Sequence, residues 1–318
     1  MKTSILVTGA TGYVGRHCAT YLSAHGYDVL LGSRHSQPRP SSEKWITYGC
    51  APELNVLKST LRKCQIVVHC AGQNQVSKNL VSQSSAWSTN VNFTRTLAEL
   101  SADAGVQHFI FISSALVVAG ARDAAGRVGP DAAPSPMSAY AQTKWAAEQA
   151  LAETSAATGL QYTILRPPMV YGPAAKGNFA RLAKLARSGL PLPLGGAIAA
   201  KSFIFVDNLA SAITAAVART PPRTNSTFLV SDGDDTSTAD LLREIAMQAN
   251  GTAPLFRLPH ATLKWVFISF GLREEWEKLF APFVIDSKPF SEWANWTAPV
   301  PFREAIRLSV APATPRGP

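Results

Sequence analysis

The sequence predicts an α/β fold: a Rossmann-type doubly wound parallel sheet with a smaller α/β substrate-binding lobe. Two observations predict it. Short apolar runs alternate with helical patterns through the first two thirds of the chain. A glycine-rich turn follows the first run and leads directly into the first helix. Continuous apolar runs separated by helices are typical of a parallel sheet that is covered on both faces.

The expected elements follow one another in a regular order. Apolar runs predict strands over residues 5–7, 27–31, 66–68, 109–112, 162–165 and 202–206. Helical patterns predict helices over residues 13–25, 86–104, 138–158 and 208–218. The loop over 120–136 is rich in Ala, Gly, Pro and Asp, and it joins a strand to a helix. Such a loop is expected at the sheet edge where ligands bind.

A change in composition predicts the domain organisation. After residue 168, Pro and Gly become frequent, and from residue 221 the pattern weakens while aromatic residues cluster. We therefore expect a dinucleotide-binding domain over 1–169 plus 201–220, and a substrate-binding lobe over 170–200 plus 221–310. The tail over 311–318 carries three prolines and is expected to be disordered.

The bulk composition is that of a folded chain with a substantial core. Its 318 residues are 46% hydrophobic and 16% charged, which fits one large domain or two intimate ones. The net charge is +9, but the basic residues are scattered, with no run of Lys or Arg and no base-stacking motif. An anionic small-molecule substrate or simple solubility therefore explains the charge better than nucleic acid.

Cysteine usage and the N-terminus favour a cytoplasmic protein. The four cysteines Cys18, Cys50, Cys64 and Cys70 show no CxxC spacing, which indicates reduced thiols. No signal segment is visible, and the apolar stretch 265–270 is far too short to span a bilayer. We expect no membrane partner, no nucleic-acid partner and no metal site.

A glycine fingerprint, TGATGYVG, occupies residues 8–15. Its first glycine permits a tight turn, its second lets the backbone approach a pyrophosphate, and its third lets helix and strand pack closely. The helix that follows offers free N–H groups and a partial positive charge to phosphates. We expect the dinucleotide to be held here by Gly9, Thr11, Gly12, Tyr13, Val14 and Gly15.

The end of the second strand favours NADP(H) as the cofactor. An acidic residue there would bind the ribose 2′-hydroxyl of NAD, but residues 31–35 (LGSRH) contain none. Arg34 can instead pair with a 2′-phosphate, and Ser33 can add a hydrogen bond. NAD(H) remains possible, because Arg34 can also stack on adenine or point into solvent.

A catalytic group is indicated by Tyr140 and Lys144, which share one face of the predicted helix. A nearby cation lowers the pKa of a phenol, so Lys144 can prepare Tyr140 for proton exchange with a substrate oxygen during hydride transfer. Lys144 can also bind the hydroxyls of the nicotinamide ribose. Ser114 ends the strand 109–112 at the ligand-binding edge, where its hydroxyl can bind the same oxygen.

These motifs resemble the extended short-chain dehydrogenases/reductases, the NAD-dependent epimerase/dehydratase family of nucleotide-sugar epimerases, dehydratases and 4-ketoreductases. The resemblance covers nearly the whole chain and includes VHCAG at 68–72, NV at 90–91, FISS at 111–114, RPPMVYGP at 166–173 and FIFVDNLA at 203–210. It implies that Ala71, Asn90 and Pro167 lie beside the cofactor and that Asn90 also braces the active-site strand. It also implies a homodimer in which helices 86–104 and 138–158 pair with their copies.

The resemblance extends to the substrate and has departures that matter. It implies that Asn178 and Lys201 contact a substrate diphosphate, although a lysine is less specific there than the family's more usual arginine. Segment 189–194 resembles a turn that lies against the nucleobase. Cys50 stands where the family often has an Asp near adenine, and residues 118–120 (VAG) lack the Tyr of the family's VYG. Residues 115–116 replace the Asp-Glu pair of dehydratases, which argues against 4,6-dehydration.

The resulting prediction is NADP(H)-dependent reduction of the 4-keto group of a UDP-linked 6-deoxy-N-acetyl sugar in surface-polysaccharide synthesis. The missing acid over 31–35 favours this reductase. One alternative is an NAD-dependent nucleotide-sugar 4-epimerase, and another is a reductase of a different ketone or alcohol. A non-catalytic dinucleotide sensor is a further alternative, but such proteins usually lose the Tyr and Lys that are present here.

Overall fold

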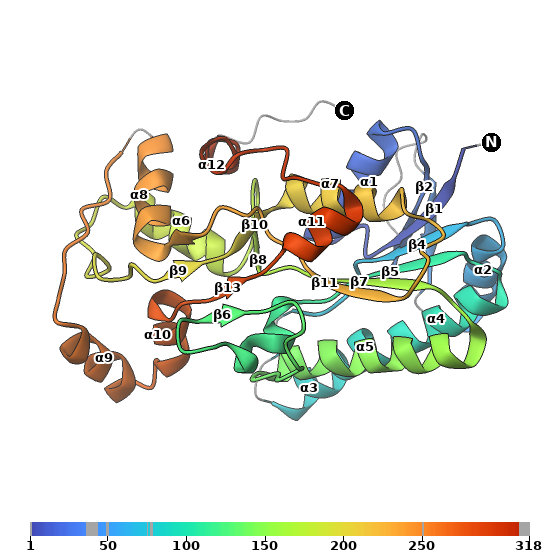
Figure 1. Cartoon of the computed structure of the whole chain (residues 1–318), viewed down its shortest axis with the longest axis horizontal. Coiled ribbons are helices and arrows are strands. Elements are labelled where there is room, and N and C mark those ends of the chain that lie inside the picture. The colour runs from blue at the N-terminus through green and yellow to red at the C-terminus, as the bar shows by residue number, and fades with distance from the viewer. Residues whose placement is uncertain are drawn as a thin grey trace.

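A computed structural model of the chain describes residues 2–35, 44–48, 51–74, 76, 79–249 and 251–311. Its centre is a seven-stranded parallel sheet in the order β11-β7-β5-β4-β1-β2-β3 (Figure 1). The strands are β1 (Ser4–Thr8), β2 (Asp28–Ser33), β3 (Trp45–Thr47), β4 (Ile66–His69), β5 (His108–Ile112), β7 (Tyr162–Arg166) and β11 (Ser226–Leu229). The predicted fold class is confirmed. Cys50 and the tail beyond 311 lie outside the described residues.

The strand order reverses between β1 and β4, because the chain builds β2 and β3 on one side and the later strands on the other. In an open α/β sheet, ligands bind at the carboxyl ends of the strands beside such a reversal. The glycine fingerprint follows β1 and Ala71 follows β4, so both lie at this point.

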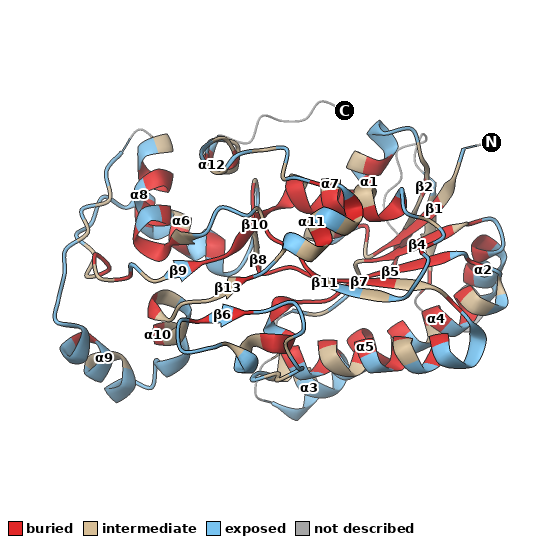
Figure 2. Cartoon of the chain, viewed as in Figure 1, coloured by how far each residue is buried: buried red, intermediate tan, exposed pale blue. Residues whose placement is uncertain are grey.

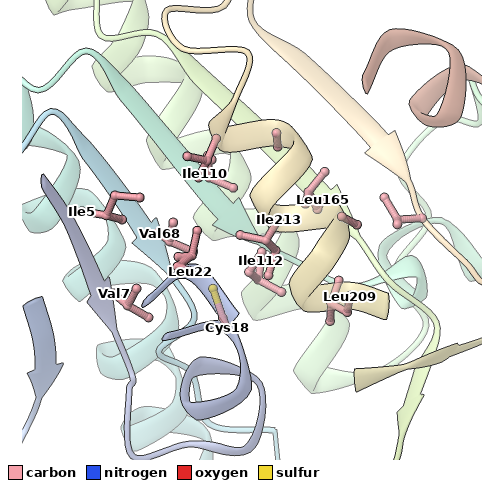
Figure 3. Packing of buried hydrophobic residues seen from close by; sticks show 14 of the residues in the cluster. Ile5, Val7, Cys18, Leu22, Val68, Ile110, Ile112, Leu165, Leu209 and Ile213 are labelled. Atoms are coloured by element: carbon pink, nitrogen blue, oxygen red, sulfur yellow. The ribbon is translucent and has the colours of Figure 1, made fainter. Parts of the chain in front are cut away.

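Alternate residues of the central strands face opposite helical layers. Ile5, Val7 and Val68 belong to the core beneath α1 (Tyr13–Ala24) and α7 (Val206–Val217) (Figure 3). Leu6 and Val67 belong to the core beneath α2 (Ala51–Leu61), α4 (Phe93–Asp103) and α5 (Ala139–Thr158). Burial on both faces explains why these strands are uninterrupted apolar runs, as the red central strands of Figure 2 show.

The helix expected over 86–104 is divided into three parts. The segments are α3 (Leu80–Trp87), a π-helical turn (Ser88–Asn92) and α4. A π turn widens the helix by one residue and commonly occurs at functional sites. Here it carries Asn90, whose side chain is buried.

A second unit adjoins the sheet and has its own core. Its helices are α6 (Asn178–Arg187), α8 (Thr238–Gln248), α9 (His260–Ser269), α10 (Arg273–Phe280) and α12 (Phe302–Val310). Two-stranded pairs accompany them: β8 (Met169–Tyr171) with β10 (Phe203–Phe205), β9 (Ala200–Lys201) with β12 (Thr236–Ser237), and β6 (Arg127–Val128) with β13 (Val284–Ile285). A 3₁₀ helix (Ala115–Ala121) and α11 (Lys288–Ala294) complete the described elements.

Two strands lie elsewhere than the predicted division implies. The run 202–206 forms β10, which pairs with β8 and not with the central sheet. Conversely, β11 pairs in parallel with β7 and is the seventh strand of that sheet, although it lies beyond residue 220. After α7, the chain adds β11 to the central sheet and then continues to α8. The sheet therefore does not end at the predicted domain boundary.

Candidate active site

The turn after β1 is shaped so that only glycine fits at its first position. Gly9 has φ +71°, and a Cβ there would lie 2.6 Å from the backbone of Ala71. A Cβ on Gly15 would lie 2.2 Å from the carbonyl oxygen of Gly9. The turn is closed by a 2.8 Å hydrogen bond from the amide of Gly12 to that oxygen. These contacts place the backbone where a ligand can approach it closely.

The helix that follows is open at its N-terminus. α1 begins after Gly12 without a side-chain cap, and its first turn carries no acidic residue. Thr11 and Gly12 are exposed, while Tyr13 and Val14 lie in the first helical turn. The uncapped N–H groups and the helix dipole suit a pyrophosphate. The structure thus fits the predicted dinucleotide at this point, with the described residues of the fingerprint as its cradle.

The ribose end of this site contains no carboxylate among residues 31–35. Ser33 is buried, and its hydroxyl donates a 2.5 Å hydrogen bond to the carbonyl of His35. Its proton is therefore not directed at a ligand, contrary to the simplest form of the prediction. Arg34 is exposed and donates to the hydroxyl of Thr89 at 2.7 Å. That arginine is in reach of solvent and remains the only cation over 31–35.

Ser114 and Tyr140 are brought together at the carboxyl edge of the sheet. Ser114 caps the 3₁₀ helix, where its hydroxyl oxygen accepts from the amide of Leu116 at 3.2 Å. Tyr140 lies in the first turn of α5, with its phenol close enough to the Ser114 hydroxyl for that hydroxyl to act on its pKa. Burial raises the pKa of Tyr140 to about 12, while the neighbouring Ser114 hydroxyl acts to lower it. The phenol is therefore a proton donor at neutral pH.

Lys144 lies one helical turn after Tyr140, as predicted, and its ammonium lies over a ring of β5. It sits 4.3 Å from the centre of the Phe111 ring, and a Cβ on Gly72 would lie 3.5 Å from it. Burial lowers the pKa of Lys144 to about 8, and the carboxylate of Glu148 acts to raise it. The largest effect on the pKa of Tyr140 is desolvation, which raises it; lowering of that pKa by Lys144 stays a prediction.

The ammonium of Lys144 is prepared for a ligand. Lys144 is only 4% exposed, and its ammonium lies over the Phe111 ring. From there it can donate to hydroxyls of a bound ribose, a role that stays a prediction.

Glu148 is the main residue that sequence reasoning missed. It lies on α5 four residues after Lys144, and it accepts from the Ser113 hydroxyl and from Arg166 Nε at 3.0 Å. Both Glu148 and Arg166 are buried. The ion pair links α5 to the end of β7, and the hydrogen bond from Ser113 links α5 to the end of β5. The i, i+4 spacing from Lys144 is the signal that would have found it.

Asn90 braces the site through hydrogen bonds of its side chain. Its side-chain oxygen accepts from the amide of Gln73 at 2.7 Å, and its nitrogen donates to the hydroxyl of Thr143 at 2.9 Å. Thr143 in turn donates to the carbonyl of Tyr140 at 2.8 Å. The π turn is thereby tied both to the loop after β4 and to the helix of Tyr140.

Tyr48 is another supporting residue that the sequence did not reveal. Its hydroxyl accepts from the amide of Gly9 at 3.1 Å, and its ring stacks on Phe93 at 4.7 Å between centroids. It lies just after β3, a strand that the apolar pattern did not predict. No local spacing links it to the glycine turn.

Pro167, predicted beside the cofactor, is buried, and its carbonyl accepts from the amide of Ala115 at 2.8 Å. The two predicted substrate contacts, Asn178 and Lys201, differ in exposure. Asn178 is exposed at the first residue of α6. Lys201 is buried and donates to the carbonyl of Ala281, and burial lowers its pKa to about 8. In this conformation the structure therefore does not present Lys201 to a diphosphate.

A surface hollow of about 530 Å³ runs along α6, from Gly172 to Arg187 and Ser309. Its lining does not include Ser114, Tyr140 or Lys144. Over the part of the chain that the structure describes, no group of three or more His, Cys, Asp or Glu side chains could hold a metal ion.

Comparisons with known proteins agree with this architecture. A family model described as "NAD dependent epimerase/dehydratase family" matches residues 5–229. A UDP-glucose 4-epimerase of Vibrio cholerae is 30% identical over 311 residues, which are 96% of this chain and 94% of that protein. A dTDP-L-rhamnose 4-epimerase of Burkholderia thailandensis is 28% identical over 79% of this chain and 82% of that protein.

Solved structures show the same fold over the whole chain. A UDP-glucose 4-epimerase from Brucella ovis, in complex with NAD, superimposes with a TM-score of 0.76 at 21% identity. The match covers 97% of each chain. A UDP-glucuronic acid 4-epimerase from Bacillus cereus, also with NAD, gives a TM-score of 0.75 at 20% identity, covering 97% of this chain and 95% of that one.

Proposed function

The chain belongs to the NAD-dependent epimerase/dehydratase family, and from this premise we propose that it is a UDP-hexose 4-epimerase that retains a nicotinamide dinucleotide. The observation that carries the proposal is the near full-length similarity to the Vibrio cholerae 4-epimerase. The neighbouring hydroxyls of Ser114 and Tyr140, at the carboxyl edge of the sheet that also carries the dinucleotide cradle, support it. The solved neighbours that hold NAD support NAD as the cofactor.

The residues have complementary roles in this reaction. Tyr140 takes the proton of the sugar 4-hydroxyl as C4 becomes a carbonyl, and returns it when the alcohol re-forms with the other configuration. Ser114 holds the oxygen in place by a hydrogen bond. Lys144 binds the ribose hydroxyls. A bound oxidised nicotinamide supplies the hydride acceptor and donor and a positive charge that favours ionised Tyr140.

A second candidate is the predicted NADP(H)-dependent 4-ketoreductase, with a UDP-linked 6-deoxy-N-acetyl sugar as substrate. Two observations favour it. Residues 31–35 carry Arg34 and no carboxylate. The phenol of Tyr140 is protonated at neutral pH, since burial raises its pKa to about 12, and a protonated phenol is the form that donates to a ketone. The comparisons favour the epimerase over this reductase, which stays a prediction.

One experiment separates the two. The purified protein is denatured, and any released dinucleotide is identified by mass spectrometry. The intact protein is then incubated with UDP-glucose, with and without added NADPH. We expect bound NAD and formation of UDP-galactose without net nicotinamide consumption. Protein that purifies without dinucleotide, prefers NADPH and leaves UDP-glucose unchanged would contradict the epimerase and favour the reductase.

A further inference from the structure

Helix α9 projects from the molecule at the end opposite α2 (Figure 1). Only one side of it is covered. Leu263 is buried, and Phe267 makes edge contacts with Trp276 and Phe280 of α10 at 5.6 and 6.2 Å between centroids. The rest of the helix is largely exposed (Figure 2). α9 thus packs on α10 through one side and is exposed to solvent on its outer side.

The solvent-exposed side of α9 is rich in large apolar side chains. Trp265 is 70% exposed, and Phe270, in the turn that ends the helix, is 77% exposed. Four further large apolar side chains, all exposed, complete what we call the α9 face: Phe256, Leu258, Ile268 and Leu272. Single exposed apolar residues are ordinary, but six of them on and next to one projecting element indicate a binding surface.

Basic residues outnumber acidic ones around the α9 face. The stretch 251–273 contains Arg257, Lys264 and Arg273, all exposed, and no Asp or Glu. The acids that follow, Glu274 and Glu275, each lie 3.9 Å from the ammonium of Lys278. The α9 face therefore presents aromatic and aliphatic side chains beside the cations Arg257 and Lys264, while Arg273 is followed by acids of α10.

We propose that the α9 face docks on the surface of an anionic phospholipid bilayer. Aromatic and aliphatic side chains next to Lys and Arg are the composition of helices that lie in the headgroup region. The basic residues complement anionic headgroups. With ten residues, about 15 Å in length, α9 is too short to cross a bilayer, so it lies along the surface.

A lipid surface fits better than a second copy of the chain. A twofold contact centred on the α9 face would bring the cations of both copies together, and like charges oppose such a contact. The face is also a projecting ledge, whereas a helix-in-groove contact needs a complementary groove. The sequence led us to expect no membrane partner because it contains no spanning segment. Surface docking needs none, and none of the described helices could span a membrane.

The test measures sedimentation of the full chain with sucrose-loaded vesicles. Vesicles of phosphatidylcholine alone are compared with vesicles in which about a third of the lipid is phosphatidylglycerol. We expect binding to the anionic vesicles and weaker binding at high salt, because exposed charges are screened. A wild-type protein that sediments with neither kind of vesicle overturns the proposal, and so does equal binding to both kinds.

Matched variants locate the docking surface. Trp265→Ala combined with Phe270→Ala is expected to lower the vesicle partition coefficient by about tenfold or more. Leu80→Ala combined with Val81→Ala removes two side chains of α3 that are 83% and 81% exposed, and is expected to bind as wild type. Lys264→Glu is expected to weaken binding to anionic vesicles. This variant tests the proposal independently if the aromatic double variant fails to fold.

The same preparations distinguish a protein interface. In one outcome, the wild type fails to bind vesicles while the double variant of Trp265 and Phe270 changes the oligomeric state in sedimentation equilibrium. That result would make the α9 face a contact between copies, and the proposal would fail. Turnover of the nucleotide sugar is expected to be unchanged in both double variants, because none of the four substituted residues is assigned to the active site. Vesicle binding and catalysis are therefore read independently.

Discussion

Two features of its environment shift the pKa of Tyr140 in opposite directions. Burial raises its pKa to about 12, and the neighbouring Ser114 hydroxyl acts to lower it. Lys144, one turn away, loses part of its basicity to burial, which lowers its pKa to about 8. The resting site therefore holds a protonated phenol and an ammonium that deprotonates only in mildly alkaline solution.

Tyr140→Phe removes the proton carrier without changing the helix. We expect kcat to fall by about 10²–10⁴-fold, the range that a positioned acid-base group contributes, while dinucleotide affinity is unchanged. Steady-state kinetics and calorimetric titration with the dinucleotide check the two parts. Tyr162→Phe, which removes a phenol hydroxyl from β7, is the matched control and should retain activity. A fully active Tyr140→Phe enzyme would refute the assigned role.

Element α5 is held in place by a buried ion pair and not only by apolar packing. Glu148 and Arg166 are 2% and 9% exposed at their side chains, so the pair is shielded from water. Glu148 also accepts from Ser113, which precedes the catalytic Ser114. A single carboxylate thus sets the position of both the helix and the end of β5.

Glu148→Gln is expected to lower the free energy of unfolding by about 3–5 kcal/mol, because it leaves Arg166 buried without its counter-charge. It should also move the alkaline limb of the pH–activity profile to lower pH, since Glu148 acts to raise the pKa of Lys144. Urea denaturation and the pH profile measure these effects. The control is Glu153→Gln on the same helix, whose exposed pair with Arg95 should contribute under about 1 kcal/mol.

The turn after β1 is the second element with a sharp steric requirement. Gly9→Ala is expected to weaken dinucleotide binding by at least about tenfold and to cost stability, because it combines a positive φ with contact at 2.6 Å. Gly26→Ala also faces a positive φ, +87°, but a Cβ there meets nothing within 4 Å. Calorimetry with both variants isolates the steric part, and equal affinities in the two would show that the close approach to Ala71 is unimportant.

Over the whole molecule, two buried histidines link stability to pH. Burial lowers the pKa of His69 to about 3 and that of His108 to about 4, from 6.5. Because the folded pKa is depressed, the unfolded chain binds more protons below pH 6.5. Their stabilising contribution is therefore complete above that pH and is lost as the pH falls toward the folded values.

We expect the free energy of unfolding to fall between pH 6.5 and 4, by up to about 1.4 kcal/mol per pH unit for each histidine. Asp232 acts oppositely, since burial raises its pKa to about 6, but it does so equally in every variant. His69→Gln should reduce the slope, whereas His25→Gln, at an exposed position, should leave it unchanged. Urea denaturation across this pH range checks the difference, and identical slopes in both variants would contradict the assignment.

Much of this architecture could be predicted because its signals are local. The apolar runs, the glycine fingerprint and the Tyr140–Lys144 spacing are each contained within a few residues. β11 was not assigned to the large sheet because Ser226–Leu229 is half polar and lies at the sheet edge. Tyr48, Glu148 and the burial of Lys201 depend on contacts between distant segments, which no spacing encodes. The homodimer through α4 and α5 stays a prediction.

Transfer of a C4 label tests the central proposal most directly. UDP-glucose that carries deuterium at C4 is incubated with the purified protein, and the products are analysed by mass spectrometry and NMR. A 4-epimerase with a retained nicotinamide predicts UDP-galactose in which the deuterium is still at C4, with no net reduction of added cofactor. Loss of the deuterium to solvent, or no interconversion by protein that has been loaded with NAD, would contradict the account.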